Sequence, residues 1–360
     1  MNSTRPALYG DAVRTRTMIP LAAVVAWFLS AGLAPVDGAQ AGAPQRGDGG
    51  TVVVYSGRSE NLVQPVLDRF EEETGVDVQV RYGSTADLAL LIDEEGDQSP
   101  ADVFFSQSPG AIGYLDGRGL LGTLPDATLD RVPEEFRASD GSWVGITGRR
   151  RVLAFNPDIT PEEDLPESVL DLTGPDWEGR VGIAPSNASF QDFVTAMRLE
   201  LGDETTAEWL EGIAANDAFT FANNGAIVAA IGRGEIDVGL VNHYYVYQAL
   251  AEDPDYPGRN HDFAPDDIGS LVIVSGASVL AGAEHADQAE ALVAFLLDEE
   301  AQRYFSDETF EYPLADGVAP ADVLPDVDLT AASDIDLDID DFGGDLNTTR
   351  EMIRNAGLEG

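Results

Sequence analysis

Residues 51–82 read TVVVYSGRSENLVQPVLDRFEEETGVDVQVRY and contain two β-rich runs on either side of a helical pattern. The run at 51–55 is apolar and stops at a Ser-Gly pair, as a buried parallel strand entering a turn does. In residues 61–74 the apolar side chains recur at helical spacing, and a glycine follows. Residues 76–82 alternate between apolar and polar side chains. The stretch therefore predicts a strand, a helix and a second strand.

The same alternation continues along the chain. Short apolar runs predict strands at residues 101–105, 180–184 and 236–241. Periodic or capped segments predict helices at residues 88–92, 190–201, 226–231, 244–251, 286–297 and 348–356. Together these elements predict an α/β fold with mainly parallel sheets. The length of 360 residues predicts two domains and a leader, with candidate hinges at residues 145–151 and 271–280.

The charge balance is strongly acidic. The chain has 65 Asp and Glu residues against 20 Arg residues and no Lys, which gives a formal net charge of −45. Such a surface repels phosphate backbones and argues against nucleic-acid binding. We interpret it as a halophilic acidic surface that keeps the protein soluble in concentrated salt, with a cation-attracting role as the alternative. Cysteine is absent, which excludes disulfides, thiolate metal sites and a lipid-anchor cysteine.

The N-terminal region has the order of a secretory signal peptide. Arginines in residues 1–17 precede an uncharged apolar run at 18–34, and small residues follow it. We predict a signal peptide over 1–41 and a Gly-rich linker over 42–50. A retained membrane anchor is the alternative, because the apolar run is at the short edge of a membrane span. The protein is accordingly predicted to be secreted across the cytoplasmic membrane, and to be periplasmic or extracellular.

Motifs of catalysis are missing from the sequence. His243, His261 and His285 do not have the spacing of metal ligands, and neither a nucleophile elbow nor a glycine-rich phosphate loop occurs. The run DIDLDIDD at 334–341 lacks the turn glycine and terminal glutamate of a calcium loop, and it predicts an edge strand with a solvated acidic face. The sequence therefore predicts that the protein is not an enzyme.

Neighbouring tyrosines follow a predicted strand in VNHYYVY, residues 241–247. At a strand-to-helix junction the phenols of Tyr244 and Tyr245 can turn into one crevice, at the strand end where open α/β sheets bind ligands. Phenolates are hard oxygen donors that suit a small, highly charged cation such as Fe3+. The alternative is that both rings only pack and form hydrogen bonds.

Two polar loops precede predicted helices. The loop at 185–189 (PSNAS) offers hydroxyls and free N–H groups at a helix N-terminus, which is a typical place for an anion. The loop at 222–225 (ANNG) opens the helix predicted at 226–231 in the same way. Ordinary helix capping is the alternative for both loops.

From residue 51 to the C-terminus the chain resembles the ferric-ion-binding proteins of bacterial ABC iron importers. The resemblance is carried by motifs in the order TVVVYSGRSE, SPADVFFSQ, GRRRVLAFNP, WEGRVGIAPSNASFQDF, GEIDVGLVNHYYV, GSLVIVSGASVL and EYPL. It implies the two-lobed, type II periplasmic-binding-protein fold. It also implies a site in which paired tyrosines bind Fe3+ beside an exogenous, synergistic anion, such as carbonate, bicarbonate or phosphate.

The resemblance assigns roles to individual residues. Tyr244 and Tyr245 match the paired iron ligands. A further set matches the residues that hold the anion: Ser186, Asn187, Ala188, Ser189, Asn224 and Asn242. Arg149 or Arg151, in the family's basic segment facing the cleft, is expected to neutralise the anion, and Arg58 is a second candidate.

The chain departs from the family at three ligand positions. Ser59 stands where many members have a histidine, Gln107 where many have a glutamate, and Phe155 where others have a third tyrosine. We therefore expect an anion, water or an unidentified group to complete the coordination of the iron.

The resemblance also implies a lobe arrangement and a partner. One lobe is expected over 51–146 plus 275–320, and the other over 150–270 plus the C-terminal segment 321–360. Closure of the lobes would bury the ion, which a monomeric receptor would hand to an ABC transporter permease. A receptor for a small anion such as a phosphonate or sulfate, without a metal, is the first alternative. A secreted hydrolase with paired carboxylates is the second.

Overall fold

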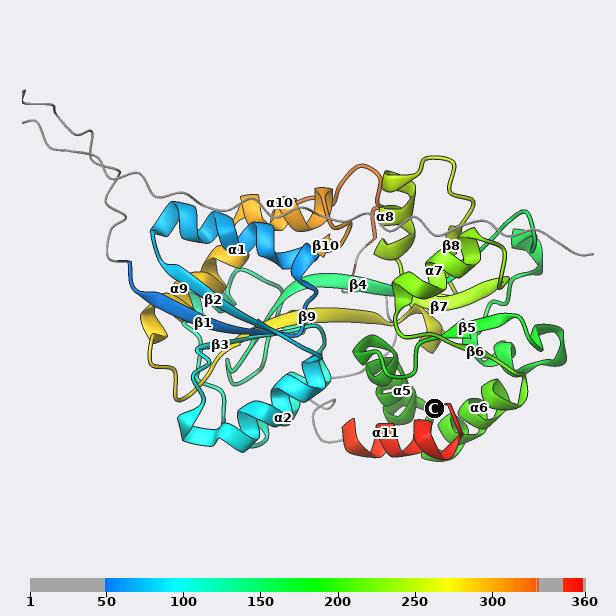
Figure 1. The fold of residues 1–360 in the computed structure, drawn as a ribbon, viewed down its shortest axis with the longest axis horizontal. Helices are drawn as coiled ribbons and strands as arrows, with labels where there is room; N and C mark the ends of the chain where they lie inside the picture. Colours follow the sequence, from blue (N-terminus) through cyan, green and yellow to red (C-terminus); the bar gives the residue numbers. More distant parts are fainter. Residues whose placement is uncertain (1–48, 328, 330–345, 359–360) are drawn as a thin grey trace, which may run out of the picture. The chain divides into compact units, whose positions relative to one another are not determined.

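The fold is described by a computed structural model over residues 49–327, 329 and 346–358. The predicted signal peptide and the acidic run DIDLDIDD lie outside these residues. In the described part, a ten-stranded sheet has the order β2-β1-β3-β9-β4-β7-β5-β6, with β8 and β10 paired to β4. Helices pack around this sheet (Figure 1).

Lobe 1 is the group of elements around the first three strands. β1 (Thr51–Ser56) pairs in parallel with β2 (Asp77–Tyr82) and β3 (Val103–Ser106). β1 passes into α1 (Glu60–Thr74), which ends at Gly75 with a left-handed φ of 74°. The lobe also contains α2 (Thr85–Glu95), α3 (Pro109–Asp116), α4 (Asp126–Leu129), α9 (Ala286–Leu296), α10 (Glu299–Asp307) and β10 (Tyr312–Pro313).

Two long strands continue from lobe 1 into the rest of the sheet. β9 (Val272–Val279) pairs with β3, and also with the first half of β4 (Val144–Phe155). The second half of β4 pairs with β7 (Val238–Asn242) and β8 (Arg259–His261). The register between β4 and β9 shifts between Gly145 and Thr147. β4 and β9 are thus the strands that cross between the two groups of elements (Figure 1).

Lobe 2 is the group of elements around β7. β7 pairs in parallel with β5 (Val181–Ile183), which pairs with β6 (Phe219–Thr220). The lobe also contains the helices α5 (Ala188–Leu201), α6 (Asp203–Ala215), α7 (Asn224–Gly232), α8 (Tyr244–Glu252) and α11 (Leu346–Asn355). Short 3-10 helices occupy Gly96–Gln98, Glu134–Phe136, Glu162–Asp164, Val169–Thr173, Pro175–Trp177 and Ile268–Ser270.

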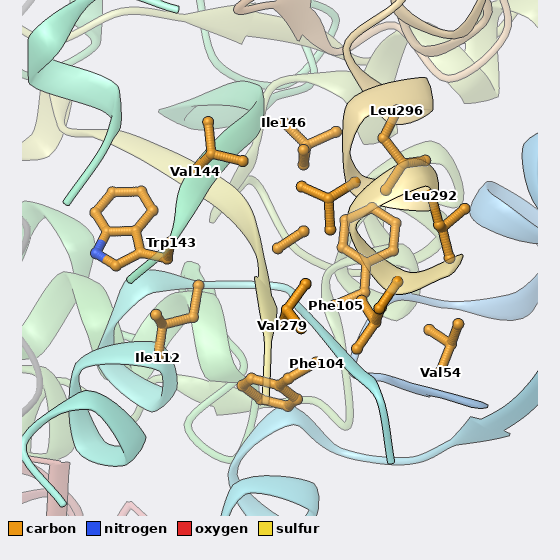
Figure 2. Close-up of a cluster of buried hydrophobic side chains, with 14 of the residues drawn as sticks. Val54, Phe104, Phe105, Ile112, Trp143, Val144, Ile146, Val279, Leu292 and Leu296 are labelled. Atoms are coloured by element: carbon orange, nitrogen blue, oxygen red, sulfur yellow. The ribbon is translucent and has the colours of Figure 1, made fainter. Parts of the chain in front are cut away.

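Each lobe has its own hydrophobic core. In lobe 1 the aromatic rings of Phe104, Phe105 and Trp143 pack with aliphatic residues of β1, β4, β9 and α9 (Figure 2). In lobe 2 one cluster surrounds Trp209 and the phenylalanines of α5, and a smaller one lies under α7 and α8. Tyr244 is an exception, because it belongs to α8 of lobe 2 but packs into the core of lobe 1.

Most predicted elements occur with ends shifted by a few residues. The helices predicted at 190–201, 244–251 and 286–297 are α5, α8 and α9, and the strand predicted at 236–241 is β7. We did not predict α3, α6 and α10, or the long strands β4 and β9, in which the candidate hinges lie. The expectation of mainly parallel sheets is wrong, because β4 and β9 pair antiparallel with their neighbours. Within the residues that the structure covers, no helix has the length and apolar character needed to cross a membrane.

Candidate metal and anion site

The two predicted iron ligands lie side by side. The rings of Tyr244 and Tyr245 stack with centroids 4.3 Å apart and an angle of 28° between their planes. Tyr244 is 1% exposed, whereas Tyr245 is only partly buried. Both residues open α8, one residue after β7 ends. The junction thus brings two phenols to one place, as the sequence predicts.

Asparagines and a serine surround this junction. Asn187 caps α5 by accepting from the backbone N–H of Ser189 at 3.0 Å, and its side chain also accepts from the Ser189 hydroxyl at 2.6 Å. Asn224, at the start of α7, donates to the Ser189 hydroxyl at 3.2 Å. Asn223 caps α7 through Ala226. The capping alternative is therefore realised, and the same loops also build a connected polar cluster.

Arg151 joins this cluster to the end of β7. It lies opposite Asn242 in the β4–β7 pairing, and its Nη1 donates to the Asn242 side chain at 3.2 Å. Nη1 also lies 3.4 Å from the Ser189 hydroxyl, and Nη2 donates to the carbonyl of Leu240 at 3.1 Å. Burial lowers the pKa of Arg151 to about 9, and the positive charge of Arg149 acts in the same direction.

Arg149 is the second buried guanidinium. It is fully buried on β4, and its Nη2 donates to the backbone carbonyl of Gln107. Burial lowers its pKa, and the positive charge of Arg58 lowers it further. Among the described residues, several buried donors of this region have no hydrogen-bond partner: Nε and Nη1 of Arg149, Nε of Arg151 and Nδ2 of Asn242. An exogenous anion could accept hydrogen bonds from such donors.

Arg58 is bound within the protein. Its Nη2 donates to both carboxylate oxygens of Glu311 at 2.7 Å, and the two side chains are 1% and 0% exposed. Glu311 also accepts from the Thr147 hydroxyl at 2.9 Å, which lies 2.6 Å from the hydroxyl of Ser275 on β9. Although burial lowers the pKa of Arg58, Glu311 raises it above its ordinary value.

The other predicted positions come from several elements, and Ser186 and Ala188 are the ones that belong to the loop at 185–189. Ser59 and Ser186 are exposed, while Gln107 and Ala188 are partly buried. Phe155 is 2% exposed and packs in the core of lobe 2. Within the described ranges, no group of three or more His, Asp or Glu residues could hold a metal ion. The phenols of Tyr244 and Tyr245 are hard oxygen donors at this junction.

Burial has the largest effect on the pKa of the Tyr244 phenol. It raises the pKa of Tyr244 well above the ordinary value, and the charges of Tyr245 and Glu311 act in the same direction. Arg58 and Arg149 oppose this effect. A strongly polarising cation is therefore needed to displace this phenol proton near neutral pH.

Sequence reasoning missed two buried carboxylates near the site. Glu311 belongs to the quoted EYPL motif, but no role was predicted for it. Asp192 lies on α5, is 2% exposed, and is under the influence of the Arg149 charge. The helical spacing of Phe190, Phe193 and Met197 predicts one apolar face of α5. Asp192 lies away from that face, so the pattern does not predict its burial.

The sequence of this chain is similar to those of known solute-binding proteins. Residues 98–339 match the family of bacterial extracellular solute-binding proteins. The chain belongs to this family. This solute-binding protein is 33% identical over 331 residues to the Fe(3+)-binding periplasmic protein of Serratia marcescens, covering 89% of this chain and 93% of that protein.

Solved structures agree with this result. Iron-bound HitA from Pseudomonas aeruginosa has a TM-score of 0.81 and 35% identity, over 86% of this chain and 99% of that chain. The Trichodesmium protein IdiA (FutA), in complex with iron and citrate ligands, has a TM-score of 0.71 and 25% identity, over 86% and 100% of the chains. The two-lobed periplasmic-binding-protein fold and the resemblance to ferric-ion-binding proteins are thus confirmed. The family comprises solute-binding proteins, which agrees with the prediction of no enzyme.

Proposed function

We propose that this solute-binding protein binds Fe3+ through Tyr244 and Tyr245 together with an exogenous anion. The observation that carries the proposal is the stacked pair of phenols beside buried guanidinium and amide donors that lack partners among the described residues. Two phenolates leave the ion with a net positive charge and with too few of the about six donors that it prefers. An anion supplies both the missing charge and further oxygen ligands.

The anion lies, in this proposal, between the tyrosines and the cluster of Asn187, Ser189, Asn224 and Asn242. Arg151 provides a buried positive charge, for which the salt bridges of the described residues include no carboxylate partner, and the start of α5 adds the partial positive charge of a helix N-terminus. Carbonate, bicarbonate and phosphate fit this chemistry. Citrate is a further candidate, because a solved relative contains iron and citrate.

The wider role follows the family. We propose that the protein acts outside the cytoplasm as a monomer and delivers its ion to an ABC transporter permease. The two lobes would close by bending of β4 and β9. In this proposal one lobe spans 51–146 plus 275–320, and the other spans 150–270 plus 321–360. The packing of Tyr244 into the core of lobe 1 supports this, because it ties the site to closure.

Titration of the metal-free protein with Fe3+ tests the proposal. We expect a visible phenolate–iron band that is weak in carbonate-free buffer and strong with bicarbonate. Tyr244→Phe and Tyr245→Phe should each abolish most of the band, whereas the matched control Tyr82→Phe, in lobe 1, should retain it. An unchanged band in both variants would contradict the ligand assignment. Tight binding of an anion without any colour would favour the metal-free receptor instead.

A further inference from the structure

Asp192 is a carboxylate of lobe 2 that is buried against lobe 1. It lies in α5 and is 2% exposed. Its carboxylate accepts a hydrogen bond from the side chain of Ser108, the residue immediately before α3. The second oxygen, Oδ2, has no hydrogen-bond partner among the residues that the structure covers. Asp192 thus forms an interlobe contact that leaves half of its carboxylate unsatisfied.

The surroundings of Asp192 compensate its charge only in part. Arg149 of β4 is the charged group that acts on it, and this guanidinium donates to the Gln107 carbonyl. α5 also packs against α6, α11, β9 and the 3-10 helix Ile268–Ser270, and among the described residues of these elements no further charge acts on the carboxylate. Burial raises the pKa of Asp192 to about 7, because its effect is larger than those of the Ser108 hydrogen bond and the Arg149 charge, which lower the pKa.

Separation of the lobes would return this carboxylate to water. A solvated aspartate has a pKa of about 4. The closed arrangement, with the higher pKa, therefore holds a proton that the open arrangement releases between about pH 4 and pH 7. As the pH rises through this window, the closed arrangement loses stability relative to the open one.

We propose that Asp192 couples closure of the lobes to the uptake of one proton, being neutral when the lobes are closed and ionised when they are open. The proton comes from solvent on closing and returns to solvent on opening. At neutral pH and above, an ionised Asp192 favours opening, so that it promotes release of the bound ion. This proposal rests on the proposed function at one point, because the release of iron is used to measure the opening of the lobes.

Iron release measures the coupling directly. Iron-loaded wild type and Asp192→Asn are mixed with excess EDTA between pH 5.5 and 8.0, and the loss of the phenolate–iron band gives the rates. The ratio of the two rates removes the competition of protons for the phenolates, which both proteins share. We expect this ratio, wild type over variant, to rise at least about tenfold over the range, since one pKa unit corresponds to a factor of ten.

Control variants sharpen this result. Glu200→Gln changes an exposed carboxylate of the same helix, and its ratio to wild type should stay flat. Ser108→Ala removes the hydrogen bond that favours ionisation, and should move the pH dependence to higher pH. A ratio for Asp192→Asn that does not change with pH, while the band forms normally, overturns the proposal and leaves iron binding intact.

Small-angle X-ray scattering of the metal-free proteins decides the proposal without iron. The radius of gyration of wild type should increase between pH 5.5 and 8.0, and that of Asp192→Asn should increase less. Equal pH dependence in the two proteins overturns the proposal, whatever the iron titration shows. A failure of the phenolate–iron band alone contradicts the proposed function and not the role of Asp192.

Discussion

The ion pair of Arg58 and Glu311 allows a quantitative test of how the site is held together. The Nη2 atom of Arg58 lies 2.7 Å from both carboxylate oxygens, and the two side chains are 1% and 0% exposed. Arg58→Met removes the cation and leaves a buried carboxylate whose remaining donor among the described residues is the Thr147 hydroxyl. Breaking a buried pair in this way costs about 3–5 kcal/mol.

The double variant Arg58→Met/Glu311→Met removes both charges. It therefore separates the net energy of the ion pair from the cost of leaving one buried charge unpaired. Replacing both members by apolar side chains is often neutral or stabilising, so the double variant should recover most of the loss. At about 2 °C per kcal/mol for a chain of this size, Arg58→Met should lower the Tm by about 6–10 °C. The pair of Arg81 and Glu95, 3.9 Å apart and with side chains 55% and 22% exposed, provides the control, since Arg81→Met should cost about 0–1 kcal/mol.

Calorimetry of the metal-free proteins and chemical denaturation give these values. A cost below about 1 kcal/mol for Arg58→Met would refute the reasoning, because it would mean that water reaches Glu311 or that the pair opens readily. A double variant less stable than the single variant would refute it as well, since it would show a net contribution of the ion pair itself.

Three further outcomes follow from charge and packing. With a net charge of −45, the unfolding midpoint should rise between about 0.01 M and roughly molar KCl as repulsion is screened, and a flat midpoint would contradict a halophilic surface. Gly239→Ala should cost about 1–3 kcal/mol in denaturant titrations, because its Cβ would lie 2.2 Å from Ile227, whereas Gly282→Ala, in open space, should be neutral. The folded-state pKa of Asp192 is raised to about 7, so wild type should lose up to about 4 kcal/mol relative to Asp192→Asn from about pH 4 to pH 7, and equal curves would contradict this.

The fold was largely predictable because its elements are marked by local patterns. The apolar run of β1, the periodicity of α1 and the glycine that ends it are features of adjacent residues, and the structure reproduces them. α10 was missed because its sequence EEAQRYFSD is mostly polar, and only Ala301, Gln302, Phe305 and Ser306 are buried. Its position depends on packing against distant parts of lobe 1, such as the backbone of Ile146 that accepts from Gln302. No local pattern records such a contact.

The candidate site likewise contains residues that the sequence predicts and residues that it does not. The stacked tyrosines were predictable because a strand-to-helix junction places neighbouring side chains together, and the asparagine loops because they cap helices. Asp192 and Glu311 were not, because their chemistry depends on burial rather than on residue type. Among 65 acidic residues, sequence offers no means of selecting the three that are buried in the described part of the structure, Asp102, Asp192 and Glu311. Burial of Glu311 is balanced by Arg58 from a turn 253 positions away, and burial of Asp192 is left incompletely balanced. Incompletely balanced burial raises the pKa of Asp192, so the residue proposed to respond to pH is one that only the tertiary structure reveals.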